Sequence, residues 1–360
     1  MAVSNVNVRH GGRVFQSARD LGLPLEQILD FSASINPLGM SDQVETAAAE
    51  AIRKSIHYPE IDAASLVDRL AEHHELLHTN LIAGNGSTAL IYLIPRCFRP
   101  QRALVVTPAF GEYARSLEQV DCHIDEFPLT AENDFAFSAE KVLAAIKPGT
   151  DIVYVANPGN PTGSGIDKRE LQLFADRLPA TTLLVVDEAF VDFCPERSII
   201  EEVRERENLL VLRSLTKFYA IPGLRAGYLA GPEKIVLHLT KQNEPWALAT
   251  PSIAAACACL DDDAYRERSC KLVPQWRQQL VDGIEALNIR VFPSVANYLL
   301  MQLPPEGPMA GTVARMLYQQ GILVRDCSDF SSLDERYLRV AVRGAEENLR
   351  LLNGLKGLLL

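Results

Sequence analysis

The sequence predicts an α/β protein: a large domain with a mostly parallel, doubly wound sheet, followed by a smaller α+β domain. Two observations predict this architecture. Short runs of Val, Ile and Leu alternate with amphipathic helical patterns through the first part of the chain. From about Ala264 onward the pattern changes to a charged helix and then to mixed strand-like and helical segments. The length of 360 residues also favours two domains over one core.

The sheet of the large domain is predicted from four apolar segments. These are residues 103–106, 151–156, 182–186 and 209–212, which have the Val, Ile and Leu content of buried parallel strands. An amphipathic helix over 167–178 separates the second from the third. Asp167 can cap this helix, and Glu170 follows three residues later. Because a strand, a helix and a strand at this spacing pair in parallel, a doubly wound sheet is expected.

The remaining elements define the domain division. A helix is expected after Ser41, with Val44, Ala47, Ala48, Ala51 and Ile52 on one stripe. After the charged helix, the sequence predicts a strand over 297–301, a loop at 304–308, a helix over 312–320, a strand over 337–342 and a final helix. We therefore expect three parts. They are an N-terminal arm (1–45) that joins the small domain and the substrate site, a large domain (46–262) and a small C-terminal domain (263–360).

Composition narrows the class of function. The formal net charge of -11 disfavours nucleic acid or an anionic membrane as a partner. No basic stretch precedes an apolar core at the N-terminus, and no apolar run is long enough to span a bilayer. Seven scattered cysteines are typical of reduced thiols, so we expect a cytoplasmic protein. His73, His74 and His78 lack matching carboxylates or cysteines, and we expect no metal site.

Polar residues directly follow all four predicted strands. Thr107 follows the first, the segment 157–163 the second, Asp187 the third, and the segment 214–217 the fourth. Ligands of open parallel sheets bind outside the carboxyl ends of the strands. The four clusters are therefore expected to face one crevice.

Lys217 and Asp187 are the two reactive residues of this crevice. Lys217 lies between an apolar strand and the apolar segment 218–221, and a lysine shielded from water becomes an amine able to form a Schiff base. A surface lysine is the alternative. Asp187 follows four apolar residues, and a buried carboxylate there suits the protonated ring nitrogen of a pyridine cofactor. A cap of the next segment is the alternative role of Asp187.

The other groups suit a phosphate and a flat ring. Ser214, Thr216 and Arg225 offer two hydroxyls and a guanidinium to a phosphate dianion. Gly86 and Ser87 precede a predicted helix over 88–98, whose N-terminal amides can complete that site. Phe110 can stack on an aromatic ring, and Asn160 can donate to a phenolic oxygen. Together these residues describe a site for pyridoxal 5'-phosphate (PLP).

The motifs at 157–163 and 187–190, and Ser214-Leu-Thr-Lys217 with Arg225, resemble those of the fold-type I PLP enzymes. Within that family they are similar to the aminotransferase branch that includes histidinol-phosphate aminotransferases, over nearly the whole chain. The resemblance implies PLP carried on Lys217 and a homodimer with shared active sites. It also implies that Tyr58 reaches the cofactor phosphate of the neighbouring subunit.

Further segments resemble the threonine-phosphate decarboxylases of cobalamin biosynthesis. They are residues 10–12, 30–39, 212–225 and 337–343. The resemblance implies decarboxylation of O-phospho-L-threonine, with His10, Gly11, Arg325 and Arg339, besides Asn160, at the substrate. Ser34 stands where an asparagine is expected to touch the substrate. Phe190 stands where aminotransferases usually have a tyrosine, which favours the decarboxylase.

The reaction depends on which bond at the Cα of the amino-acid substrate stands perpendicular to the cofactor ring. A perpendicular carboxylate leads to loss of CO₂, and a perpendicular hydrogen leads to transamination. A histidinol-phosphate-type aminotransferase is therefore the alternative function. A PLP-sensing regulator is disfavoured because no DNA-binding segment precedes the core. A nicotinamide enzyme is disfavoured because no Gly-x-Gly-x-x-Gly follows the first strand.

Overall fold

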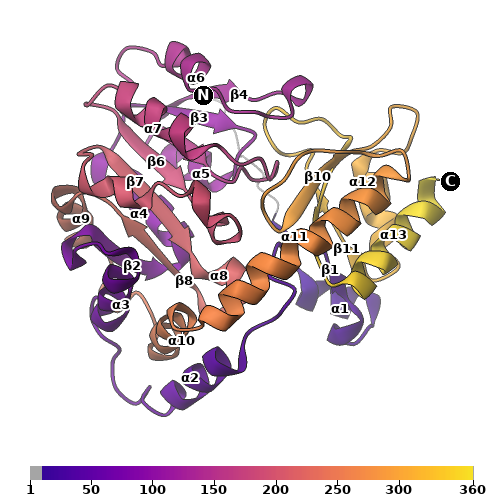
Figure 1. Cartoon of the computed structure of the whole chain (residues 1–360), viewed down its shortest axis with the longest axis horizontal. Coiled ribbons are helices and arrows are strands. Elements are labelled where there is room, and N and C mark those ends of the chain that lie inside the picture. The colour runs from indigo at the N-terminus through magenta and orange to yellow at the C-terminus, as the bar shows by residue number, and fades with distance from the viewer. Residues whose placement is uncertain (1–9, 360) are drawn as a thin grey trace.

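The computed structural model describes residues 10–359 and confirms the predicted α/β class. Figure 1 shows a large layered body around one sheet and a smaller body that includes α1 (Val14–Leu21), near the N-terminus, and the C-terminal helix α13 (Ala345–Leu359). The long helix α11 (Asp263–Glu285) runs between them. The predicted domain boundaries at 45/46 and 262/263 fall inside α2 (Asp42–Ile52) and at the start of α11, and the three-part division stays a prediction.

Within the described residues, seven strands form the large sheet, in the order β2-β8-β7-β6-β5-β3-β4. All neighbours pair in parallel except β8, which is antiparallel to both β2 and β7. The strands are β2 (Leu81–Asn85), β3 (Arg102–Thr107), β4 (His123–Pro128), β5 (Ile152–Ala156), β6 (Leu183–Asp187), β7 (Leu209–Ser214) and β8 (Ala226–Ala230). The sequence predicted β3, β5, β6 and β7, whereas β2, β4 and β8 were not predicted.

Helices cover both faces of the large sheet. Successive residues of its strands point to opposite faces and are apolar, so each face needs a covering layer. Ile152 and Tyr154 of β5 pack with α4, α5 and α9, while Val153 and Val155 face the other core. The helices of this body are α2, α3 (Ala64–His74), α4 (Gly86–Phe98), α5 (Glu112–Glu118), α6 (Ala139–Ala145), α7 (Lys168–Arg177), α8 (Leu215–Phe218), α9 (Glu233–Thr240) and α10 (Thr250–Leu260). As predicted, the side chain of Asp167 caps α7, and the side chain of Ser41 caps α2.

The smaller body is built on a four-stranded sheet in the order β12-β13-β10-β9, counted within the described residues. The arm joins it, because β1 (Leu29–Asp30) pairs in parallel with β11 (Ile322–Leu323). The other elements are α1 (Val14–Leu21), β9 (Arg290–Val291), β10 (Tyr298–Gln302), α12 (Ala310–Tyr318), β12 (Arg325–Asp326), β13 (Tyr337–Ala341) and α13 (Ala345–Leu359). No helix within residues 10–359 has both the length and the apolarity that a bilayer crossing requires.

Candidate active site

Two adjoining cavities lie where the carboxyl ends of the large sheet face the smaller body. The larger has a volume of about 560 Å³ and the smaller about 70 Å³. They share Phe110, Asn160, Phe190 and Lys217 in their linings. The four polar clusters that follow β3, β5, β6 and β7 therefore meet at one place, as the parallel strands require.

Lys217 lies between the two cavities on α8, directly after β7. Its Nζ donates to Thr216 Oγ1 at 2.9 Å and lies 5.8 Å from the centre of the Phe190 ring. Burial lowers the pKa of Lys217 to about 8, with Arg225 and Arg339 acting in the same direction and Asp187 opposing them. A lysine in this setting has a large neutral fraction near physiological pH, which is the form that attacks a carbonyl.

Asp187 ends β6 and lines the smaller cavity, where it is buried. Its Oδ1 accepts from the amide of Ala189 at 2.9 Å, and its Oδ2 accepts from the hydroxyl of Tyr113 at 2.6 Å. The carboxylate therefore caps the next segment and also faces the cavity. The role as a cap and the role as partner of a ring nitrogen do not exclude each other. Burial raises the pKa of Asp187, while Tyr113, Ala189 and Lys217 oppose that rise. A cationic ring nitrogen would give this carboxylate a charged partner.

A cradle for a phosphate lies beside Lys217. The hydroxyls of Ser214 and Thr216 are 2.7 Å apart, and both residues are buried. Gly86 begins α4 rather than preceding it, so the predicted start at residue 88 was two residues late. A Cβ on Gly86 would lie 2.4 Å from Nη2 of Arg225, and its φ of 73° favours glycine. The Arg225 guanidinium can approach Gly86 this closely only because glycine has no side chain.

Asn160 and Phe110 both line the two cavities. Oδ1 of Asn160 accepts from Nη1 of Arg339, which leaves the Nδ2 hydrogens of Asn160 as donors. Phe110 packs edge-on against Tyr113, with ring centres 5.9 Å apart. These positions suit the predicted contacts with a phenolic oxygen and a ring face.

Arg325 and Arg339 occupy register positions directly opposite each other on β12 and β13, and both are buried. Arg325 pairs with Asp329 at 2.8 Å and stacks on Phe330. Arg339 donates to the carbonyl of Ser32 at 2.7 Å, and burial lowers its pKa. Its Nε has no partner within the part of the chain that the structure describes. Two like charges placed opposite each other favour an anion between them.

His10, Gly11 and Ser34 also line the larger cavity. Nε2 of His10 donates to Oε1 of Glu112 at 2.9 Å. The Ser34 side chain is buried, and its Oγ has no hydrogen-bond partner among residues 10–359. A buried hydroxyl without a partner is costly unless a ligand or water satisfies it, so this side of the cavity is built for a polar group.

The structure places the predicted site residue Tyr58 on the surface of the large body. It lies between α2 and α3, is 81% exposed, and stacks on Trp246 with ring centres 4.9 Å apart. The described residues that line the two cavities do not include it. Its reach into a neighbouring subunit stays a prediction.

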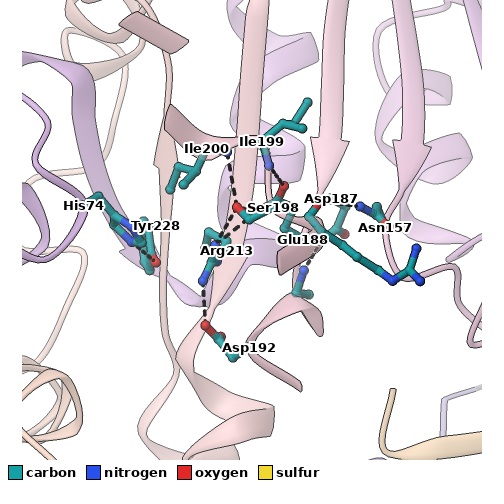
Figure 2. A network of polar contacts seen from close by, with 12 residues as sticks. His74, Asn157, Asp187, Glu188, Asp192, Ser198, Ile199, Ile200, Arg213 and Tyr228 are labelled. Carbon is teal, nitrogen blue, oxygen red and sulfur yellow. Dashed lines mark hydrogen bonds and ion pairs between the residues drawn. The ribbon is translucent and has the colours of Figure 1, made fainter. Parts of the chain in front are cut away.

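A buried ionic network supports the site from the opposite face of β6 and β7. Figure 2 shows Arg213 between Glu188 and Ser198 on one side and Asp192 on the other. Arg213 Nη1 lies 3.1 Å from Glu188 Oε2, and Nη2 lies 2.5 Å from Asp192 Oδ1. Arg213 and Glu188 are the chain neighbours of Ser214 and Asp187, and side chains of neighbouring strand residues point to opposite faces. The network therefore fixes the strand ends that carry Ser214 and Asp187, of which Asp187 lines the smaller cavity.

The sequence did not identify three residues that shape the site. Tyr113, on α5, donates a hydrogen bond to Asp187, and the carbonyl of Ser32 accepts one from Arg339. The backbone amide of Asn36 donates to the carbonyl of Lys217 at 3.0 Å. The available signals were the position of Tyr113 three residues after Phe110 and the alternate polar residues of the segment 32–36. Within residues 10–359, no group of three or more His, Cys, Asp or Glu has the arrangement of a metal site.

The donor set fits PLP. A half-buried lysine and a buried carboxylate line one cavity, and the hydroxyls of the phosphate cradle lie beside the lysine. These are the groups that hold the aldehyde, the ring nitrogen and the phosphate of this cofactor.

Comparison with known proteins agrees with this chemistry. The model of the family "aminotransferase class I and II" matches residues 26–354. The threonine-phosphate decarboxylase of Salmonella typhimurium is 36% identical over 98% of this chain and 97% of its own length. The structure of L-threonine-O-3-phosphate decarboxylase from Porphyromonas gingivalis has a TM-score of 0.81 and 28% identity, covering 92% of this chain and 99% of that one.

An aminotransferase has a comparable fold. The histidinol-phosphate aminotransferase of Clostridium acetobutylicum has a TM-score of 0.83 and 26% identity, covering 92% of this chain and 98% of that one. The family match spans nearly the whole chain and includes all the elements that build the cavities. The chain therefore belongs to the class I and II aminotransferase family and is a PLP enzyme.

Proposed function

We propose that this enzyme decarboxylates O-phospho-L-threonine to (R)-1-amino-2-propanol phosphate and CO₂, a reaction of cobalamin biosynthesis. The proposal is supported by the 36% identity to a threonine-phosphate decarboxylase over 98% of the chain. A histidinol-phosphate-type aminotransferase is the alternative.

The observation that carries the proposal is the pair Arg325 and Arg339. Both guanidinium groups are buried, lie opposite each other on neighbouring strands, and line the same cavity as Lys217. A substrate with both a carboxylate and a phosphate supplies two anionic groups for this pair. Ser34 and His10 add a hydroxyl and an imidazole to the same wall.

The roles of the residues around the cofactor follow from their positions. When bound, PLP supplies an aldehyde that links to amines and a protonated ring that accepts the electron pair of a bond broken at Cα. Lys217 is the residue that would carry it, and Asp187 would keep its ring nitrogen protonated. Ser214, Thr216, Arg225 and the amides of Gly86 and Ser87 would hold its phosphate. Phe110 would cover the ring face, and Asn160 would donate from Nδ2 to the phenolic oxygen.

The chain's own residues select which bond breaks. Arg339 and Arg325 hold the substrate's carboxylate and phosphate and so fix the rotation about the bond from nitrogen to Cα. In the proposed reaction the bond from Cα to the carboxylate carbon breaks, CO₂ leaves, and Cα gains one proton. The Lys217 amine, or a water molecule, delivers this proton to Cα.

Phe190 favours the decarboxylase over the aminotransferase. Its ring lies near Nζ of Lys217 and is buried, but it has no hydroxyl to donate to the cofactor. An aminotransferase would need an oxo acid as amino-group acceptor, and this requirement separates the two functions.

We further propose that the enzyme is a cytoplasmic homodimer. An exposed apolar patch, formed by Ile52, Ile56, Tyr58, Ile61 and Trp246, lies around the connection between α2 and α3. A second copy covering this patch would bury it and would bring Tyr58 to the partner's phosphate cradle. The molar mass in solution, and loss of cofactor affinity in Tyr58→Phe, test this assembly.

The direct test of the function is CO₂ release from O-phospho-L-threonine by the PLP-loaded enzyme without any oxo acid. Catalytic release together with (R)-1-amino-2-propanol phosphate is the expected result. If the cofactor is instead converted to its amine form with no CO₂ released, the enzyme is an aminotransferase. Ser34 is then the first residue to exchange for asparagine.

A further inference from the structure

Residues 10–12, which we call the strap, lie beside the larger cavity and contact both bodies of the protein. His10 and Gly11 line this cavity. At one end of the strap, Nε2 of His10 donates to Oε1 of Glu112, which belongs to α5 of the large body. The His10 ring also packs against Phe110, with ring centres 5.8 Å apart. The imidazole is thus fixed at the cavity by a residue that does not itself line it.

The other end of the strap is anchored on Ser32. The amide of Gly12 donates to Ser32 Oγ at 2.9 Å, and Ser32 Oγ in turn donates to Asp30 at 2.6 Å. A Cβ on Gly11 would lie 2.2 Å from the carbonyl oxygen of Ser32, so the strap packs on this segment without any side chain between them. The same carbonyl accepts from Arg339. The strap therefore holds His10 in a fixed relation to Arg339.

Glu112 is well suited to act as an anchor. It is 5% exposed, and its second carboxylate oxygen accepts from the hydroxyl of Tyr92 on α4. Burial and the adjacent carboxylate raise the pKa of Tyr92 to about 12, so Tyr92 stays a donor at neutral pH. Arg115 lies 3.6 Å from Oε1 and partly balances the charge. A buried carboxylate with these partners has little freedom to move.

We propose that Glu112 is a positioning residue for substrate recognition. It fixes His10 through Nε2, so that Nδ1 remains to contact the phosphate of the substrate. The inference rests on the proposed function, because it assigns the His10 side of the cavity to the phosphate of O-phospho-L-threonine. Glu112 itself touches neither substrate nor cofactor and acts only through the strap.

The test compares Glu112→Ala with Glu118→Ala in the PLP-loaded enzyme. Glu118 is an exposed glutamate on the same helix and serves as the matched control. We expect Glu112→Ala to raise KM for O-phospho-L-threonine roughly tenfold or more, the effect of one lost hydrogen bond to a charged group, with little change in kcat. Because Glu112 is buried, His10→Asn is a second variant at an exposed side chain, and it should give the same rise. In the double variant the two effects should not multiply.

A readout without substrate tests the anchoring separately. Hydrogen exchange of the Gly12 amide should be faster in Glu112→Ala and unchanged in Glu118→Ala. A wild-type KM in Glu112→Ala, effects that multiply with His10→Asn, or unchanged exchange at Gly12 would each overturn the inference. A wild-type enzyme that releases no CO₂ overturns the proposed function instead, and the exchange of Gly12 then still decides whether Glu112 anchors the strap.

Discussion

The hydroxyl of Tyr113 donates a 2.6 Å hydrogen bond to Oδ2 of Asp187, joining α5 to the end of β6 inside the smaller cavity. Burial raises the pKa of Asp187, and this bond acts against the rise. Tyr113 thereby helps to keep Asp187 ionised, which is the state that pairs with a cationic ring nitrogen.

Tyr113→Phe should shift the acidic limb of the pH profile. Without the hydroxyl, the pKa of Asp187 rises further, so the carboxylate becomes protonated at a higher pH. We expect kcat/KM to begin falling at a higher pH as the solution is acidified, and kcat at neutral pH to fall about severalfold. Steady-state rates across pH measure this. Tyr318→Phe, at a half-buried tyrosine that lines neither cavity, should leave the profile unchanged, and an unshifted acidic limb in Tyr113→Phe would contradict the role of the bond.

The depressed pKa of Lys217 predicts how the apoenzyme takes up its cofactor. With a pKa of about 8, about half of Lys217 is neutral at pH 8, against well under about 1% of an ordinary lysine. The rate of loading with PLP should therefore rise with pH up to about 8 and then level off. Stopped-flow absorbance of the bound cofactor measures this rate. A rate that keeps rising towards pH 10 would show that Lys217 is not shielded from water.

Lys217→Ala is the matching test of the covalent role. The variant should show neither the visible absorbance band of lysine-bound cofactor nor any turnover, at any pH. Substantial activity in Lys217→Ala would remove this residue from the chemistry.

The ionic network behind the cavities should dominate the stability of the strand ends. Glu188 and Arg213 are both buried, and removing one partner leaves an uncompensated charge. Arg213→Met should therefore lower the free energy of unfolding by about 3–5 kcal/mol. Glu201→Gln breaks an exposed pair with Lys168 and should cost under about 1 kcal/mol. Denaturant unfolding at one fixed protein concentration compares them, and equal effects would contradict the importance of burial.

The sequence predicted the fold where local pattern decides the structure. The runs at β3, β5, β6 and β7 are apolar on both faces, so their strand character is written in the residues themselves. β8 (Ala226–Ala230) is short, contains Gly227, and gains its place by pairing antiparallel with β2 and β7. Such long-range pairing leaves little trace in the local sequence.

The residues of the site likewise fall into those that the local sequence predicts and those that depend on long-range packing. Lys217 and Asp187 were predictable because each directly follows an apolar strand, and parallel strands bring their ends together. Tyr113 and Glu112 were not predicted, because their partners lie 74 and 102 residues away and meet them only when helices pack on the sheet. The opposition of Arg325 and Arg339 likewise depends on the register of β12 and β13.

Substitution of Arg339 tests whether the paired guanidinium groups recognise the substrate. It holds Asn160 and the carbonyl of Ser32 and lies close enough to Lys217 to lower the pKa of that lysine, so it can hold an anionic group near Cα. Arg339→Ala should raise KM for O-phospho-L-threonine at least about tenfold.

Arg339→Lys keeps the charge but lacks the planar fork, so its KM should lie between those of Arg339→Ala and the wild type. Arg336→Ala is the control, because Arg336 lies three residues away, is exposed and pairs with Asp334 at 2.9 Å. Initial rates of CO₂ release over a range of substrate concentrations separate KM from kcat. A wild-type KM in Arg339→Ala would place the substrate's anionic groups elsewhere, because a buried guanidinium cannot be lost from a binding site without weakening the ligand it holds.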